Sequence, residues 1–292
     1  MKPIWLNKKI RLTECSETKS LLREMKLETV CEQASCPNIG ECFSQRHATF
    51  LILGRQCTRS CSFCNIVKGE PLPPDPCEGA RVAEAVKKLV LKHVVITSVT
   101  RDDLADGGAG IFADTVLQIR RNSPRVTIEI LIPDFKLSQD SLRAVALPLP
   151  GSKIPGPGPG IGQGADIIAH NVETVPSLYQ SVRQDSDYKR SLGVLDAIKK
   201  ISPHLKTKSG MMLGMGESQP EILAVMKDLR AVGCDFLSIG QYLAPSKAHY
   251  PVKEYITPDQ FSLYKETGLN MGFLHIESGP YVRSSYRAGE YL

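Results

Sequence analysis

Two patterns of apolar residues alternate along most of the chain. Short runs rich in β-branched and other apolar side chains are typical of buried strands, and they lie at residues 50–53, 94–98, 126–132, 166–171, 208–214 and 236–240. The stretches between them repeat apolar residues every three or four positions, which predicts amphipathic helices. One such helix face carries Ile222, Val225, Met226, Leu229 and Val232.

Strands that alternate with helices usually pair in parallel and are joined by right-handed crossovers. Six such units predict an α/β fold, a partial (β/α)6 barrel of the TIM type. Periodicity alone leaves an open doubly wound sheet as the alternative. Polar clusters follow five of the six strands, where a barrel carries its chemistry, and this favours the barrel. The clusters are residues 56–68, 97–108, 170–173, 214–217 and 240–242.

Two segments depart from this alternation. Residues 1–49 are polar and helix-prone, then rich in cysteine, and show no strand pattern before Phe50. Residues 148–160 are dense in proline and glycine, a composition that cannot hold a helix or strand and predicts a loop. This loop lies between a helix and the next strand, hence on the face of the barrel opposite the expected site. A partner-docking flap is its functional interpretation, and a tolerated insertion is the one we favour.

Composition and charge exclude some classes of protein. The 292 residues are 42% hydrophobic and 23% charged, as in ordinary globular proteins, and the net charge of +5 is mild. No block of Lys and Arg indicates a nucleic-acid partner, and no apolar window of about 18 residues indicates a membrane span. The start of the chain lacks the apolar core of a secretion signal. We therefore expect a cytoplasmic protein, although a mature organellar enzyme would have the same features.

Cysteine spacing carries the chemistry of this chain. Six of the nine cysteines form two triplets: Cys31, Cys36 and Cys42 are spaced C-x4-C-x5-C, and Cys57, Cys61 and Cys64 are spaced C-x3-C-x2-C. A 4Fe–4S cluster usually takes one thiolate on each iron, so a triplet leaves one iron open for another ligand. Tight groups of cysteines without export signals indicate metal thiolates in a reducing compartment rather than disulfides.

The second triplet has the more familiar spacing. C-x3-C-x2-C is the signature of radical S-adenosylmethionine (SAM) enzymes, in which the open iron chelates SAM. Its position after the first predicted strand and the aromatic Phe63 before the last cysteine fit such a loop. A zinc site is the alternative, but zinc sites usually combine two C-x2-C pairs into four ligands, and only one such pair is present here.

In combination, the motifs resemble those of the lipoyl synthases. The matching residues are 31–42, 48–54, the triplet at 57–64, 94–99 with 101–103, 207–210 and 279–286. The resemblance spans nearly the whole chain, from about residue 20 to residue 287. Its most specific part is the C-x4-C-x5-C triplet combined with the Arg-Ser-Ser-Tyr sequence at 283–286. The chain departs from the family in the longer link that contains the Pro/Gly-rich run.

This resemblance implies a mechanism. Lipoyl synthases insert two sulfur atoms into an octanoyl chain that is attached to a lysine of a lipoyl carrier domain. A cluster on Cys57, Cys61 and Cys64 would bind SAM and cleave it to methionine and a 5′-deoxyadenosyl radical, which removes hydrogen at C6 and then at C8. The carbon radicals would attack sulfides of a second cluster, held by the other triplet, which is consumed as the sulfur donor.

The same resemblance implies that Ser284 supplies the fourth ligand of the second cluster, with Ser285 as the alternative. A serine oxygen is a harder donor to iron than a thiolate, which would make that iron easier to lose when sulfide is extracted. Without the family match, Ser284 would be interpreted as a surface hydroxyl near the end of the chain.

SAM itself needs polar partners for its adenine, ribose and amino-acid ends. The candidates at the barrel mouth are Thr97, Ser98, Asp102, Asp103, Asn171 and Glu173. An acidic side chain suits a ribose diol, and a hydroxyl or amide suits the carboxylate. Asp102 and Asp103 have an alternative role as helix N-caps.

The resemblance also implies an organisation, cofactors and partners. Residues 1–49 would be an N-terminal extension with the loop of the auxiliary cluster, residues 50–276 the barrel, and residues 277–292 a tail that closes the barrel mouth. The cofactors would be SAM and two 4Fe–4S clusters. The carrier domain would belong to the E2 subunit of a 2-oxoacid dehydrogenase or to the glycine-cleavage H protein. A low-potential electron donor, such as ferredoxin or flavodoxin, and an iron–sulfur carrier would be further partners.

Two other functions stay open at this point. Another radical SAM sulfur-inserting enzyme, such as a biotin-synthase-like protein or a methylthiotransferase, is disfavoured by the N-terminal position of the C-x4-C-x5-C triplet and by the serine-containing tail. An iron–sulfur electron carrier would use fully ligated clusters, and the long strand–helix pattern after the cysteines would have no role.

Overall fold

The computed structural model describes residues 3–7, 15–147 and 164–291, so the Pro/Gly-rich run at 148–160 lies outside the described residues. Eight strands form one sheet, in the order β1-β2-β5-β6-β7-β8-β9-β10. These strands are β1 (Glu28–Thr29), β2 (Thr49–Ile52), β5 (His93–Ser98), β6 (Thr127–Leu131), β7 (Ile167–Ala169), β8 (Lys206–Leu213), β9 (Phe236–Gln241) and β10 (His275–Gly279). All neighbours pair in parallel except β1, which is antiparallel to β2.

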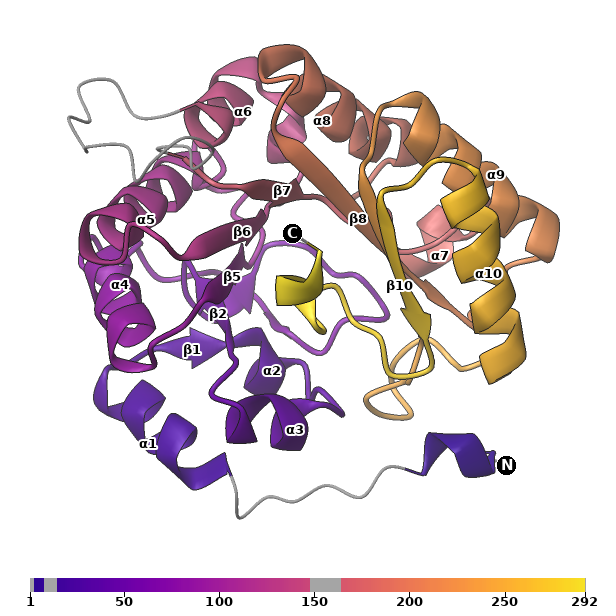
Figure 1. Ribbon diagram of the computed structural model, residues 1–292, viewed down its shortest axis with the longest axis horizontal. Coiled ribbons are helices and arrows are strands. Elements are labelled where there is room, and N and C mark those ends of the chain that lie inside the picture. Colours follow the sequence, from indigo (N-terminus) through magenta and orange to yellow (C-terminus); the bar gives the residue numbers. More distant parts are fainter. Residues whose placement is uncertain (1–2, 8–14, 148–163, 292) are drawn as a thin grey trace.

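Helices follow the strands and cover the outside of the sheet. They are α4 (Glu78–Lys88), α5 (Ala109–Asn122), α6 (Gln139–Ala146), α7 (Tyr179–Val182), α8 (Tyr188–Ile201), α9 (Gln219–Ala231) and α10 (Pro258–Asn270), with the short turns η3 (Phe135–Leu137) and η4 (Pro176–Leu178). Figure 1 shows the strands as an open ring with these helices around it. A doubly wound sheet would carry helices on both faces, so the predicted partial barrel of six strand–helix units is confirmed.

The end of the barrel differs from the prediction. β10 is a further parallel strand, paired with β9 in a register that places Ile276 opposite Leu237. Ile276 is the one buried residue of this strand, so the apolar pattern does not reveal it. β10 also crosses residue 276, where the sequence placed the boundary between barrel and tail. The expectation of no strand before Phe50 is wrong as well, because β1 precedes it.

The N-terminal extension shares the core of the barrel. It contains η1 (Ile4–Leu6), α1 (Ser16–Glu24), α2 (Val30–Gln33) and α3 (Ile39–Ser44). Leu22 and Phe43 are buried in the same apolar cluster as the barrel strand residue Phe50, and the Thr18 hydroxyl donates a hydrogen bond of 2.9 Å to the Phe43 carbonyl. From Cys15 onward, the extension therefore packs as part of the barrel's own core rather than as a separate body.

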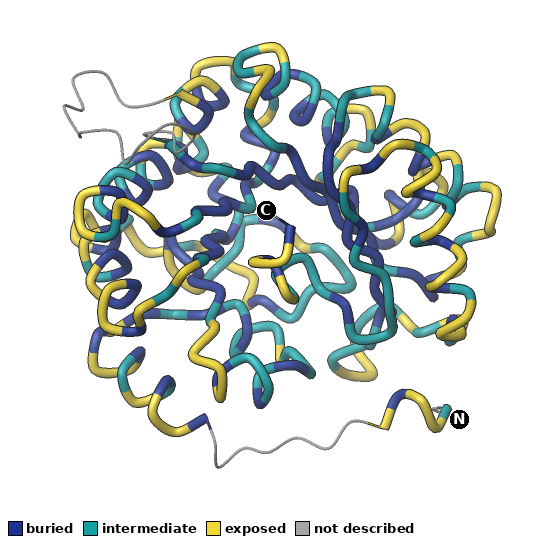
Figure 2. The backbone as a smooth tube through the Cα atoms, in the orientation of Figure 1, coloured by how far each residue is buried: buried dark blue, intermediate teal, exposed yellow. Residues whose placement is uncertain are grey.

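The last residues of the chain turn into the ring of strands. Figure 1 shows the short turn η5 (Ala288–Glu290) and the C-terminal end within the ring, and Figure 2 shows both exposed and buried positions there. Ala288 and Tyr291 are buried. No helix of the described segments has the length and apolarity that crossing a membrane requires.

The contribution of β10 can be tested at Ile276, which is fully buried against the helices. We expect Ile276→Ala to lower the free energy of unfolding by about 2–5 kcal/mol, because it leaves a cavity in the core. Urea denaturation of the cluster-free protein, followed by circular dichroism, measures this change. The control is Leu274→Ala, because Leu274 lies next to β10 and is 58% exposed. Its truncation should change stability by about 0.5 kcal/mol or less. Equal effects of the two substitutions would contradict the burial of β10.

Candidate active site

A cavity of about 510 Å³ opens where the loops after the strands meet. Its walls contain thiols from both triplets, namely Cys31, Cys36, Cys57, Cys61 and Cys64. Other predicted site residues on its walls are Thr97, Ser98, Asn171, Glu173 and Ser284. Cys42, Asp102 and Asp103 are not among the lining residues. The structure therefore brings most of the predicted site together around one space.

The loop of the second triplet is closed by a small ladder. β3 (Gln56–Cys57) pairs in parallel with β4 (Val67–Lys68), and the residues between them carry Cys61 and Cys64. The chain leaves β2 sharply, because Leu53 and Gly54 adopt left-handed φ angles of 69° and 91°. The Cys64 amide donates a hydrogen bond of 3.2 Å to the Cys61 carbonyl. This turn holds the last two thiols of the motif on one side of the loop.

The first triplet lies on the N-terminal extension. Cys31 is on α2, whose N-cap Thr29 accepts a hydrogen bond of 3.3 Å from the Glu32 amide. The Cys36 amide donates to the Cys31 carbonyl at 3.0 Å, so the chain curls between these two thiols. Cys42 is on α3, partly buried against the core. The structure thus brings two thiols of this triplet to the cavity, and the role of Cys42 as a ligand stays a prediction.

The thiols suit iron–sulfur clusters better than a single ion. Burial raises the pKa of Cys31 and Cys61 to about 11 and that of Cys64 to about 12, because a thiolate loses its hydration there. A cationic iron centre offsets this cost, since thiolate sulfur is its preferred ligand. Within the described ranges, no three His, Cys, Asp or Glu side chains are grouped to hold one metal ion. Cluster ligands bind different irons, so they do not need to converge on one point.

Several polar atoms of the cavity residues are unsatisfied. Ser98 Oγ, Asn171 Oδ1 and His170 Nε2 are buried and have no hydrogen-bond partner among the described residues. Buried polar groups normally have such partners, so these atoms fit a polar molecule such as SAM. Burial lowers the pKa of His170 to about 4, and its Nδ1 lies 2.9 Å from the Ile132 carbonyl oxygen. His170 is therefore neutral at physiological pH.

Asn171 connects Ser284 with Glu173. Its Nδ2 atom donates to Ser284 Oγ at 2.6 Å and to Glu173 Oε1 at 3.0 Å. Gly210 of β8 permits this approach, since a Cβ atom there would lie 2.8 Å from both Asn171 Oδ1 and Ser284 Oγ. Burial raises the pKa of Glu173 although the charge of Arg183 opposes the shift. Ser284 is thus held on the cavity wall by a residue that is itself a predicted SAM contact.

Two predicted SAM contacts have other partners. Asp102 forms an ion pair of 2.7 Å with Arg59, and Asp103 forms one of 2.8 Å with Arg101. The N-cap of α5 is Gly108, so the alternative role of the two aspartates as caps of this helix is wrong. A direct contact of Asp102 or Asp103 with SAM stays a prediction.

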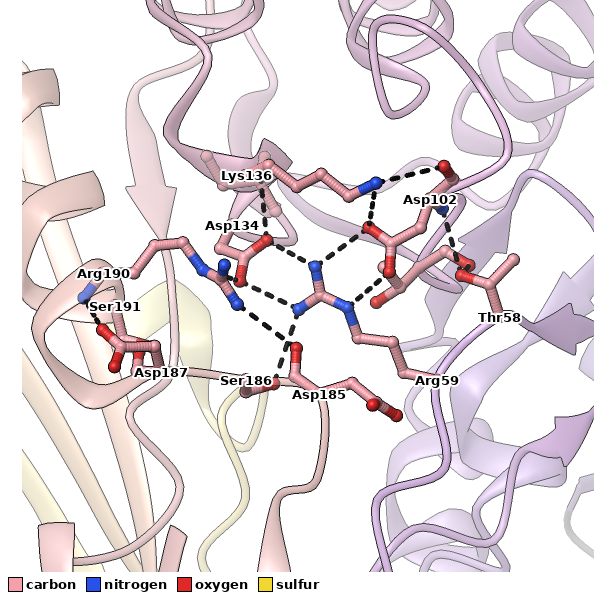
Figure 3. Close-up of polar contacts among 12 residues, drawn as sticks. Thr58, Arg59, Asp102, Asp134, Lys136, Asp185, Ser186, Asp187, Arg190 and Ser191 are labelled. Atoms are coloured by element: carbon pink, nitrogen blue, oxygen red, sulfur yellow. Dashed lines mark hydrogen bonds and ion pairs between the residues drawn. The ribbon is translucent and has the colours of Figure 1, made fainter. Parts of the chain in front are cut away.

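Arg59 is bound by two carboxylates at once, as Figure 3 shows. Its guanidinium donates to Asp102 and to Asp134 at 2.7 Å each, and its side chain is 5% exposed. Arg190 also donates to Asp134, at 2.9 Å. Burial disfavours the charged forms of Arg59 and Asp134, but the hydrogen bonds between the two side chains favour the charged forms more strongly. They raise the pKa of Arg59 and lower that of Asp134.

This ion-pair network holds the loop of the second triplet in place. Arg59 lies between Cys57 and Cys61 in the sequence, whereas Asp102 and Asp134 follow β5 and β6. The Asp102 amide also donates to the Thr58 hydroxyl at 3.0 Å. The ends of two barrel strands are therefore fastened to the middle of the cysteine motif.

Sequence reasoning missed three charged residues of the cavity, namely Arg59, Asp134 and Arg183. The position of Arg59 inside the C-x3-C-x2-C motif is a signal that could have identified it. Arg183 donates to the Tyr179 hydroxyl at 3.1 Å and to Ser191 at 3.0 Å, and no sequence pattern marks it.

Comparison with solved structures defines the class of this fold. The chain is similar to HydG, a maturase of FeFe-hydrogenase, with a TM-score of 0.58 and 12% identity over 89% of this chain and 62% of that one. It is also similar to Streptococcus suis SuiB bound to SAM, with a TM-score of 0.55 and 11% identity over 80% and 51% of the two chains. The third similar structure is coproporphyrinogen III oxidase HemN from Escherichia coli, a radical SAM enzyme. Its TM-score is 0.50 and its identity 13%, over 76% of this chain and 51% of that one. The fold is that of the radical SAM enzymes.

Sequence relatives then identify the family, although no family model matches the chain. The chain is 55% identical to the lipoyl synthase of Geobacter metallireducens over 99% of its own length and 97% of that protein. It is 55% identical to the lipoyl synthase of Geobacter sulfurreducens, over 99% of this chain and 90% of that protein. It is 49% identical to the lipoyl synthase of Caldanaerobacter subterraneus, over 98% of this chain and 95% of that protein. The chain belongs to the lipoyl synthase family. It is a radical SAM enzyme that inserts sulfur, and the electron-carrier alternative is wrong.

The Arg59 network predicts a measurable dependence of the cluster loop on this side chain. We expect Arg59→Met to lower the free energy of unfolding by about 3–5 kcal/mol, because it leaves the buried Asp134 carboxylate with less compensation. Urea denaturation measures the loss, and iron content after reconstitution should fall with it. The control is Lys136→Met, an exposed partner of Asp102 at 3.8 Å whose loss should cost about 1 kcal/mol or less. Wild-type stability and iron content in Arg59→Met would contradict the role of the network.

Proposed function

We propose that this lipoyl synthase inserts sulfur at C6 and C8 of an octanoyl chain on a lysine of a lipoyl carrier domain, and that it holds two 4Fe–4S clusters. The observation that carries this proposal is the meeting of thiols from both triplets on the wall of one cavity. A sulfur atom can reach a carbon radical only if donor and radical source are neighbours, because proximity governs such a step. A chain with one triplet at the cavity would have no such donor.

Cys57, Cys61 and Cys64 would hold the cluster that binds SAM. When bound, this cluster supplies the electron for cleavage of SAM, which yields a radical able to attack an unactivated C–H bond that ordinary side chains cannot activate. Thr97, Ser98, Asn171 and Glu173 would contact SAM. The unsatisfied Ser98 and Asn171 oxygens support their part in this set. Asp102 and Asp103 would act indirectly, through Arg59 and Arg101.

The cluster on Cys31, Cys36 and Cys42 would be the sulfur substrate, with Ser284 as its fourth ligand. Ser284 Oγ already accepts a hydrogen bond from Asn171, a donor that stabilises negative charge on the oxygen. Oxygen binds iron less tightly than thiolate does in such a soft site, so the serine-bound iron would be the first to leave. Asn171 would then keep the released hydroxyl in place.

The protein's other task is to hold the octanoyl chain at the radical. Apolar side chains of the tail and the barrel line the cavity, namely Val282 of the tail and Leu51, Val99, Leu131 and Met211 of the barrel. Such a radical would abstract hydrogen from any weaker C–H or S–H bond within reach, so a wall that fixes the octanoyl chain beside it protects the reaction. The extension, the barrel and the tail would each contribute one part of this wall, as in the predicted division at residues 49 and 276.

The remaining partners follow from the chemistry. The carrier domain would come from the E2 subunit of a 2-oxoacid dehydrogenase or from the glycine-cleavage H protein. Ferredoxin or flavodoxin would supply low-potential electrons, and an iron–sulfur carrier would rebuild the spent cluster. A reducing compartment, as in the cytoplasm, suits a chain whose cysteines form no disulfide in the described residues.

Anaerobic single turnover tests this function. Reconstituted protein, SAM, a strong reductant and an octanoyl-lysine peptide are combined, and the products are read by mass spectrometry. We expect the peptide to gain two sulfur atoms while methionine and 5′-deoxyadenosine are released, because both sulfurs come from the protein. Cleavage of SAM without sulfur gain would contradict the octanoyl substrate and favour another sulfur-inserting reaction.

The ligand role of Ser284 is tested by Ser284→Ala. We expect sulfur insertion to fall by about ten- to a hundredfold, as for the loss of a group that supports a metal ligand set. SAM cleavage should persist, since the Cys57, Cys61 and Cys64 triplet is intact. Product analysis and iron content measure the two effects separately.

Ser285→Ala is the matched control, because Ser285 also lines the cavity but lacks the hydrogen bond to Asn171. We expect it to retain wild-type sulfur insertion. Full cluster content and full sulfur insertion in Ser284→Ala would show that the serine is not a ligand. The reverse pattern, with loss only in Ser285→Ala, would transfer the role to Ser285.

A further inference from the structure

The chain after β10 forms a strap, defined here as residues 280–291. Its backbone hydrogen bonds are local turns, such as that from the Tyr286 amide to the Arg283 carbonyl at 2.9 Å. The Val282 carbonyl packs so closely on Gly240 of β9 that a Cβ atom there would overlap it. Further along, Gly289 lies against His93 of β5. The strap therefore passes from the cavity into the interior of the ring, where Figure 1 shows its end.

Tyr291 ends the strap in a closed socket and is 6% exposed. Its ring centroid lies 5.4 Å from that of Phe236 and 4.4 Å from that of His275. Its hydroxyl shares a hydrogen bond of 2.9 Å with Ser238. Lys208 Nζ lies 3.9 Å from the ring centroid, within the range of a cation–π contact. The strap is thus anchored by its last aromatic side chain.

The socket has a rigid charged base. Lys208 Nζ donates to both carboxylate oxygens of Glu129, at 3.0 and 3.1 Å, and neither side chain is exposed. A buried pair of this kind cannot rearrange without leaving a charge uncompensated. Lys208 lies near the start of β8 and does not line the cavity, so the proposed chemistry does not use this pair. The ammonium group is left facing the Tyr291 ring.

The other end of the strap is tied to the loop of the first cysteine triplet. Asn38 Nδ2 donates to the Tyr281 carbonyl at 2.6 Å, and the Tyr286 hydroxyl donates to Glu41 at 3.0 Å. Asn38 and Glu41 both lie between the second and third cysteines of that triplet. Ser284 lies between the two tied tyrosines. Its position therefore depends on how the strap is held at both ends.

We propose that Tyr291 is a positioning residue that seats Ser284 at the auxiliary cluster. This inference rests on the proposed function, in which Ser284 is the oxygen ligand. A strap with few backbone hydrogen bonds loses conformational entropy when it is ordered, and its end contacts offset that loss. The ring of Tyr291, held against Lys208, prevents the strap from withdrawing. Ser284 therefore stays on the cavity wall through each turnover.

Tyr291→Ala tests this anchor in the reconstituted enzyme. We expect hydrogen exchange of residues 280–291 to become about ten- to a hundredfold faster while β8 and β9 exchange as in wild type, because aromatic and cation–π contacts are lost. Mössbauer spectra of the auxiliary cluster should lose the signal of the oxygen-ligated iron. Tyr291→Phe keeps the ring against Lys208, so it should resemble wild type in both measurements.

Two further variants keep the test decisive. Tyr291→Leu fills the socket without an aromatic face and should give faster exchange even if Tyr291→Ala does not fold. Glu290→Gln changes the charge of an exposed strap residue and should leave both measurements as in wild type. Wild-type exchange in Tyr291→Leu, or faster exchange with an unchanged Mössbauer spectrum, would overturn the positioning role. A wild-type enzyme that lacks the oxygen-ligated signal would instead overturn the ligand role of Ser284, whereas the exchange data would still report on the anchor.

Discussion

The ion pairs of Arg59 with Asp102 and Asp134 are the interaction on which the rest of the site depends. They join the middle of the C-x3-C-x2-C motif to the ends of β5 and β6, so the cysteine loop takes its position from the barrel itself. A buried guanidinium shared by two carboxylates tolerates little displacement, because each lost bond would leave its charge less compensated. The geometry of a loop that has almost no regular structure is thereby fixed by strand ends.

The incomplete barrel explains why both chain ends are needed. The sheet begins at β1 and ends at β10, and these two strands are not paired with each other. The N-terminal extension and the strap meet through Asn38 and Tyr281, and they supply the walls that a closed ring of strands would otherwise provide. In the proposed function, the barrel would carry the SAM chemistry on its strand ends, and the two termini would hold the cluster that donates sulfur. This division suits a site in which one half is retained and the other is consumed.

Local patterns in the sequence predicted much of this arrangement. The six buried strands and the amphipathic helices follow from apolar periodicity, and the spacing of the cysteines predicts two cluster loops without any long-range information. β10 was not predicted, because a strand with a single buried residue, Ile276, shows no apolar alternation. Asp102 and Asp103 were assigned to SAM because no local pattern shows that Arg59 and Arg101 compete for them. Partners that lie 43 residues apart, as Arg59 and Asp102 do, are fixed by tertiary packing alone.

The ties between the strap and the extension have a consequence for the order of folding. Asn38 and Tyr281 are separated by 243 residues, and Glu41 and Tyr286 by 245, so these contacts close a loop that contains almost the entire chain. On the ribosome the N-terminal residues emerge first, yet they must wait for the last residues before their site is complete. The loop of the second triplet, by contrast, needs only the ends of β5 and β6 for its contacts with Asp102 and Asp134. Folding of the enzyme therefore has a built-in order, in which the loop of the second triplet is placed before the first triplet meets the strap.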